Sequence, residues 1–247
     1  MSEGSISSNL VDELTKFALY KYNEWYVMRR DGYHDAEDKD EYIYGIFLKT
    51  LENPLALPLK CIEDFLSKVK FSRLMEADEE GIRNMVCGAG KLTPRFAPKG
   101  GWKNFSEFHV ELVKKAKESG GLINYVKKFN DAESLYQELL KLPEVGEVIG
   151  LQLVRELKMV GVANVSLEKL GLPPSDPVRR VLERTGLVAK GSPWNTINEV
   201  LKKTFKIPPL VLDVGLWIIG FYYCREKPEH EACPITIVCP KLSAGNS

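Results

Sequence analysis

Apolar residues recur at intervals of three and four along most of this 247-residue chain, and that spacing restricts it to a helical fold. Near the N-terminus, for example, Leu10, Leu14 and Phe17 would share one face of a helix. Similar stripes occur at 58–75, 105–121, 131–142 and 147–159. No segment alternates polar and apolar residues over the length of a strand. The sequence therefore predicts an all-α protein with about ten helices.

Two segments interrupt the helical pattern. The acidic segment 31–41 is predicted to be a loop or a helix cap. Segment 88–104, GAGKLTPRFAPKGGWKN, holds four glycines and two prolines and is predicted to be a loop. It interleaves Arg95, Lys99 and Lys103 with Phe96 and Trp102, which suits stacking on an unpaired base or gripping a DNA strand. A structural loop around a buried tryptophan fits the same residues.

The charge balance excludes one class of partner-binding surface. Lys and Arg number 34, as do Asp and Glu, so a strongly basic nucleic-acid binder is excluded, whereas a local basic face is not. The N-terminus has no apolar core of a signal peptide. The most apolar run, 207–223, contains Asp213 and is too short to span a bilayer. We therefore expect an intracellular protein of the cytoplasm or nucleoid, without a membrane partner.

Soft metal ligands gather near the C-terminus, in the stretch CREKPEHEACPITIVC. Three of the five cysteines, Cys224, Cys233 and Cys239, lie in these sixteen residues, with His230 between them. Thiols inside a cell stay mostly reduced, so clustered cysteines point to a metal or to catalysis before disulfides.

The segment LPEVGEVIG, residues 142–150, joins two predicted helices by a very short turn. A turn this tight favours glycine, because positive φ angles cost little only there. The turn and the start of the following helix leave backbone N–H groups that can grip a DNA phosphate without reading sequence. A plain αα-hairpin is the alternative. The residues predicted to contact DNA here are Leu142, Pro143, Val145, Gly146 and Val148.

Asp176 and Pro177 open the next motif, SDPVRRVLERTG. Asp176 is predicted to be the N-cap of a helix, with proline at the first helical position. Most Asp-Pro steps at helix starts do no more than cap.

The three motifs LPEVGEVIG, SDPVRRVLERTG and LWIIGFYYCREKPEHEACPITIVC follow one another in the order and approximate spacing of the endonuclease III-like DNA glycosylases. Residues 130–240 resemble this helix-hairpin-helix (HhH-GPD) superfamily, and the stretch IPPLVLD with the following LW is similar to archaeal 8-oxoguanine glycosylases. The resemblance implies two helical lobes with a DNA-binding cleft, 1–30 with 160–247 and 31–159.

The resemblance also implies a reaction. Family members extrude a damaged or mismatched base from double-stranded DNA, and an aspartate assists cleavage of its N-glycosidic bond. That role falls on Asp176. Bifunctional members carry a nucleophilic lysine where this chain has Val148, so a monofunctional glycosylase is implied. We expect the protein to be a monomer. The family's hairpin usually has glycine where this chain has Glu144, whose charge would repel a phosphate if it faced the DNA.

In the family, four cysteines after the last helix hold a 4Fe-4S cluster. The corresponding set here is Cys224, His230, Cys233 and Cys239, with one histidine and one residue fewer. Histidine can ligate such clusters, a Cys3His set also suits zinc, and a loop that binds no metal remains open. In the family this loop presents basic residues to the DNA backbone, and here these would be Arg225 and Lys227.

Two other functions stay open at this point. One is a non-catalytic helix-hairpin-helix DNA-binding protein. The other is a metal-dependent structural or partner-binding protein without DNA contacts, which the zero net charge and Glu144 would suit.

Overall fold

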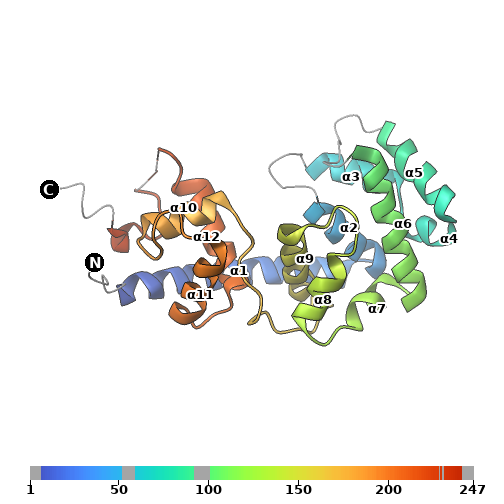
Figure 1. The fold of residues 1–247 in the computed structure, drawn as a ribbon. Coiled ribbons are helices and arrows are strands. Elements are labelled where there is room, and N and C mark those ends of the chain that lie inside the picture. The colour runs from blue at the N-terminus through green and yellow to red at the C-terminus, as the bar shows by residue number, and fades with distance from the viewer. Residues whose placement is uncertain (1–6, 52–58, 92–100, 228, 230, 241–247) are drawn as a thin grey trace. The chain divides into compact units, whose positions relative to one another are not determined.

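The structure, a computed structural model, describes residues 7–51, 59–91, 101–227, 229 and 231–240. Within these ranges the chain is helical and contains no strand, which confirms the predicted all-α class (Figure 1). The chain divides into two compact units. The continuous unit is Met28–Ser166, and the split unit combines Met1–Val27 with Leu167–Ser247. Helix α1 (Ser8–Asp35) contributes residues to both units.

Eight further helices build the continuous unit. They are α2 (Lys39–Leu51), α3 (Leu59–Lys68), α4 (Phe71–Glu76), α5 (Glu79–Lys91), α6 (Gly101–Ser119), α7 (Leu122–Lys127), α8 (Ala132–Leu139) and α9 (Glu147–Met159). Helix α2 is buried along its middle, residues 43–48, and packs against α7 and α9, while α6 packs against α5 and α7. The largest fully buried side chains of this core are aromatic: Tyr44, Phe47, Phe65, Phe71, Phe105, Phe108 and Tyr125.

The loop predicted at 88–104 has the wrong bounds, because helices occupy both of its ends. Helix α5 continues through Gly88 and Gly90 to Lys91, and α6 begins at Gly101. Glycine is tolerated inside α5 because the Trp102 ring lies against it: a Cβ added at Gly90 would be 2.6 Å from two atoms of that ring. Trp102 also stacks on Phe65, with ring centroids 6.2 Å apart. The side chain is half-buried in its own unit and is not displayed for stacking on a base.

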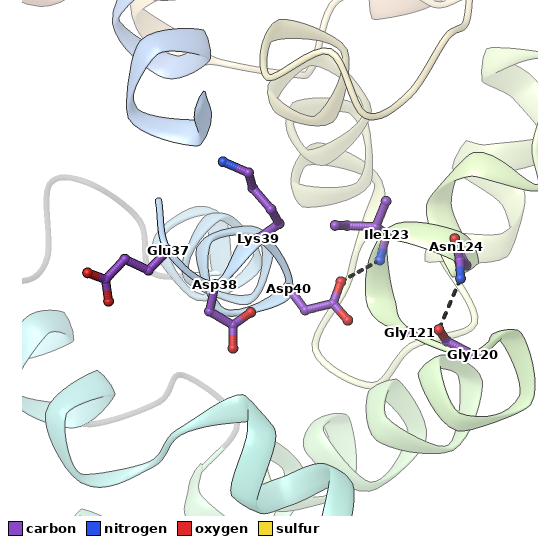
Figure 2. A pocket seen from close by; sticks show the side chains of 8 residues that line it. All are labelled: Glu37, Asp38, Lys39, Asp40, Gly120, Gly121, Ile123 and Asn124. Atoms are coloured by element: carbon purple, nitrogen blue, oxygen red, sulfur yellow. Dashed lines mark hydrogen bonds between the residues drawn. The ribbon is translucent and has the colours of Figure 1, made fainter. Parts of the chain in front are cut away.

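The acidic segment 31–41 is mostly helical, with only residues 36–38 between α1 and α2. Asp40, on α2, accepts hydrogen bonds from the backbone amides of Leu122 (3.0 Å) and Ile123 (2.9 Å), at the start of α7. Figure 2 shows the Asp40 carboxylate turned toward Ile123 in an open pocket of about 470 Å³. The Asp40 carboxylate therefore caps α7. Of the two roles predicted for this segment, loop or helix cap, this residue has the second.

The split unit contains α10 (Asp176–Arg184), α11 (Trp194–Thr204), α12 (Pro209–Ile218), a π-helix at Ile219–Tyr223 and a 3-10 turn at Thr236–Val238. Its core joins the first turns of α1 to these helices through Leu10, Leu14, Ala18, Val178, Val181, Leu182, Ile197, Leu201, Leu212 and Leu216. Helices α1 and α12 meet very closely at Gly215, where an added Cβ would lie 2.7 Å from the Cα of Ala18.

In the described part of the chain, no single helix is both long and apolar enough to cross a membrane. The pair α11 and α12, extended by the π-helix, reaches that length and apolarity only jointly, and the two segments are bent by 105°.

Candidate nucleic-acid interface and cysteine loop

The turn between α8 and α9 is a type II β-turn, which places a glutamate where glycine is favoured. The Val145 amide donates to the Leu142 carbonyl (3.2 Å), Pro143 takes the second position and Glu144 has φ 67°. Among the described non-glycine residues only Glu144 has a positive φ. Glycine at position 146 is not needed for this angle, because its φ is −84°. The sequence-based reason for that glycine is therefore wrong.

Gly146 instead precedes α9 as its N-cap, and as a glycine it has no side chain to cap the helix. Gly146 is exposed, and a Cβ added to it would meet no atom within 4 Å. The first amides of an α-helix have no intrahelical acceptor, so those of Glu147 and Val148 end next to this open space. Leu142 (2% exposed) and Val145 (6%) point into the protein and anchor the turn. The start of α9 can therefore accept an anion at its backbone.

Close packing of α8 and α9 fixes the direction of that helix start. A Cβ at Gly150 would lie 3.0 Å from Tyr136 Cε2 and 3.2 Å from Leu140 Cδ2. Only glycine lets the two helices approach this closely without displacing those side chains.

Asp176 is the first residue of α10 and is exposed. The N-cap is Ser175, whose extended backbone (φ −152°, ψ 125°) precedes the helix and whose carbonyl accepts from the Arg179 amide at 2.9 Å. The prediction that Asp176 is the N-cap is thus wrong by one residue, and Pro177 occupies the second helical position. At the first position the Asp176 carboxylate lies at the positive end of the helix dipole.

Three of the four predicted metal ligands lie on one half-buried loop. Cys224, Cys233 and Cys239 are free thiols of intermediate exposure, and Cys224 and Cys233 pack against the split-unit core. Burial raises the pKa of the Cys233 thiol, and the neighbouring Cys239 and Cys224 raise it further. The described residues contain no group of three His, Cys, Asp or Glu side chains placed to hold a metal, and His230 lies outside these residues.

The remaining predicted DNA contacts fall in different places. Arg95 and Lys99 lie outside the described residues, and Lys103 is exposed on α6. Arg225 is exposed but its Nε donates to the Phe221 carbonyl (2.9 Å), at the end of the π-helix. Lys227 is exposed. Arg225 therefore has a structural contact besides any role toward a nucleic acid.

Two further residues, Gly220 and Arg184, contact α10 or the cysteine loop, and no role was predicted for them from the sequence. Gly220 lies in the π-helix against Pro177, and the Arg184 guanidinium reaches the cysteine loop. The only signal for either is position: Gly220 is the glycine in an otherwise bulky run, IIGFYY, and Arg184 ends the Asp176 helix.

No family model matches this sequence, and no curated protein sequence matches it. Solved structures do resemble the fold. A non-covalent endonuclease III–DNA complex aligns with a TM-score of 0.50 at 15% identity, over 92% of this chain and 97% of that chain. A trapped endonuclease III–DNA covalent intermediate, an estranged-adenine complex, aligns equally well over 93% and 99%. At this identity the likeness shows a shared helical fold.

Proposed function

We propose that this protein is a DNA glycosylase that binds lesion-containing double-stranded DNA as a monomer and cleaves the N-glycosidic bond of the extruded base. The observation that carries the proposal is the similarity to endonuclease III, solved in complex with DNA, across nearly the full length of both chains. A fold can host several functions, so the function also depends on which residues bind the DNA and which take part in the reaction.

Binding is assigned to the turn at 142–146 and the first turn of α9. The exposed Gly146 leaves open space in front of this helix start. Backbone amides there hold an oxygen of a phosphate without reading a base, which is what a lesion-searching protein needs. The basic side chains Lys103, Arg225 and Lys227 are proposed as additional backbone contacts.

The reaction is assigned to Asp176. Cleavage of the bond between sugar and base develops positive charge on the sugar ring, and a nearby carboxylate stabilises that charge. The same carboxylate can orient a water molecule toward C1′. Asp176 is exposed at the start of a helix and is therefore accessible to such a substrate.

Water is the proposed nucleophile. Val148, in the first turn of α9, stands where the resemblance places the lysine of bifunctional enzymes, and an isopropyl group cannot form a Schiff base. Borohydride should therefore trap no protein–DNA adduct during base release. A trapped adduct would show that another lysine, such as Lys158, supplies the amine.

The experiment that tests the function is base release from a panel of duplexes, each with one damaged or mismatched base, under single-turnover conditions. At least one duplex should lose its base. Asp176→Asn should lower that rate by a factor of about 100 or more while DNA affinity stays within about threefold. Asp12→Asn, an exposed residue of α1 in the same unit, makes the same charge change and should leave the rate unchanged. DNA binding with no base release from any duplex would favour the non-catalytic DNA-binding function.

The cysteine loop is proposed as a metal centre that stabilises the split unit. Its thiol donors Cys224, Cys233 and Cys239 lie on one loop, and thiolates suit both iron–sulfur clusters and zinc. A bound 4Fe-4S cluster is the first choice from the resemblance and zinc the second. His230 is the proposed fourth ligand. Such a group would supply folding free energy, not a step of the reaction.

A further inference from the structure

We propose that Arg184 and Gly220 are positioning residues that orient the Asp176 carboxylate, by holding both ends of helix α10 against the π-helix and the cysteine loop. The inference rests on the proposed function, and it adds two residues to that site. Helix α10 packs against α12 and against the π-helix that follows it (Figure 1).

The N-terminal end of α10 is held by contact with a backbone that has no side chain. A Cβ added at Gly220 would lie 2.5 Å from the carbonyl carbon of Pro177 and 2.9 Å from the Cβ of Pro177. Real Cβ atoms essentially never approach so closely, and the nearest atoms belong to a backbone. Pro177 directly follows Asp176. A side chain at position 220 would therefore displace Pro177 and, with it, the adjoining Asp176.

The π-helix at Ile219–Tyr223 makes this approach part of a wide turn. The Cys224 amide donates to the Ile219 carbonyl at 2.7 Å, five residues earlier. Such turns insert one residue into a helix and recur at functional sites. Here the wide turn lies between α12 and the cysteine loop, and Gly220 is one of its five residues.

The C-terminal end of α10 is held by a guanidinium group. Arg184 NH1 donates to the Arg225 carbonyl (2.5 Å) and to the Cys224 carbonyl (3.3 Å), and it lies 3.5 Å from the Cys224 Sγ. A charged donor shared by two carbonyls makes strong hydrogen bonds. Arg184 thereby ties the last residue of α10 to the first residues of the cysteine loop.

A helix of nine residues is about 13 Å long and nearly rigid, so holding both ends fixes its axis. Asp176 is the first residue on that axis, so its position follows the direction of the helix. Misplacing a reacting group by about 1 Å can lower a rate by a factor of about 100. The orientation of Asp176 thus depends on contacts made at 184 and 220.

The test compares Arg184→Ala, Arg184→Lys and the matched control Arg179→Ala. Arg179 lies on the same helix, but its guanidinium lies over the Trp194 ring and donates to the Ser192 carbonyl (2.6 Å), away from the π-helix. Arg184→Ala should slow single-turnover base release by a factor of about 10–100 with DNA affinity within about twofold of the unchanged protein. Lysine should restore part of the rate, and Arg179→Ala should retain it.

A second pair of variants tests the other end of the helix. Gly220→Ala should slow base release in the same way, whereas Gly88→Ala should not, because Gly88 is a helical glycine of α5 with no atom within 4 Å of an added Cβ. If Gly220→Ala does not fold, the Arg184 series alone decides.

Hydrogen exchange separates this inference from the proposed function. The Arg179 amide, bonded to the Ser175 carbonyl, reports on the first turn of α10. It should exchange faster in Arg184→Ala than in the unchanged protein. Faster exchange without base release from any duplex would overturn the function but keep the two contacts. Unchanged exchange together with an unchanged rate in Arg184→Ala, while Asp176→Asn is inactive, would overturn the positioning role alone.

Discussion

The Nε2 atom of His109 lies 2.7 Å from the hydroxyl of Tyr44, and both side chains are fully buried in the continuous unit. His109 Nδ1 lies 2.6 Å from the Phe105 carbonyl, which can only accept, so Nδ1 carries the proton and Nε2 accepts from Tyr44. Burial lowers the pKa of His109 to about 4, although the bond to Phe105 opposes the shift. The ring is therefore neutral at pH 7.

This depressed pKa predicts a loss of stability in mild acid. An unfolded histidine binds a proton near pH 6.5 and the folded one only near pH 4, so protonation favours the unfolded state between these values. The free energy of unfolding should fall by about 2 kcal/mol between pH 7 and pH 5. Urea titrations at the two pH values measure it. His109→Gln should flatten the dependence and His34→Gln should not. An equally steep fall in His109→Gln would assign the effect to other groups.

Glu144 predicts a substitution that strengthens the fold. A left-handed backbone costs a side-chain-bearing residue about 1–2 kcal/mol, and glycine avoids this at the cost of some unfolded-state entropy. Glu144→Gly should therefore raise the unfolding free energy by about 0.5–1 kcal/mol. Glu147→Gly, three residues later and helical, should lower that free energy by up to about 1 kcal/mol.

The same position has a separate electrostatic consequence for DNA. Glu144→Gln removes the charge and keeps the backbone cost, so it should tighten DNA binding at low salt with no gain in stability. Fluorescence anisotropy with a labelled duplex at two salt concentrations gives the affinities. Equal affinities for Glu144→Gln and the unchanged protein would show that the carboxylate points away from the DNA.

Alanine at two glycines of this region should affect different properties, the stability of the fold at Gly150 and the affinity for DNA at Gly146. Gly150→Ala must displace Tyr136 or Leu140 and should lower the unfolding free energy by about 1–3 kcal/mol. Gly146→Ala enters open space but replaces a favoured N-cap residue, and should lower that free energy by about 0.5–1 kcal/mol. Its methyl group would stand in front of the first amides of α9, so DNA affinity should drop. Unchanged affinity in Gly146→Ala would argue against phosphate binding there.

A metal in the cysteine loop should be visible in the purified protein. An iron–sulfur cluster gives a brown protein that absorbs near about 400 nm, and zinc gives a colourless one with about one equivalent of metal. Cys233→Ser should remove either group and lower the melting temperature, whereas Cys87→Ser, a half-buried cysteine of α5, should not. Metal-free protein with unchanged melting after Cys233→Ser would leave the loop without a metal role.

Local signals in the sequence predicted most of the helices because those signals are local in the structure too. Asp131 caps α8 by accepting from the Ser134 amide at 2.8 Å, and Gly161 follows the end of α9 with φ 78°. Helix α7 was missed because its start is capped by Asp40, which lies 82 positions before Leu122. Gly90 of α5 was misassigned because the Trp102 ring that it packs against lies beyond the end of that helix.

The candidate site divides in the same way. The tight turn and the helix start at 176 follow from local composition, yet the left-handed residue and the N-cap are each displaced from their predicted positions. A single sequence gives propensities for a turn but does not fix which residue adopts each angle. Gly220 and Arg184 could not be found because their partners, Pro177 and the Cys224 carbonyl, lie about 40 residues away.

The contact between Gly215 and Ala18 has a consequence for folding during synthesis, because it can form only after Gly215 has been made. Roughly 200 residues separate the two partners, so at about 5–20 residues per second a ribosome needs about 10–40 s between them. The continuous unit is complete on the nascent chain about 50 residues before Gly215 is added. The apolar stripe at Leu10, Leu14 and Ala18 stays uncovered during that interval, which makes the N-terminal helix the segment a chaperone would meet first.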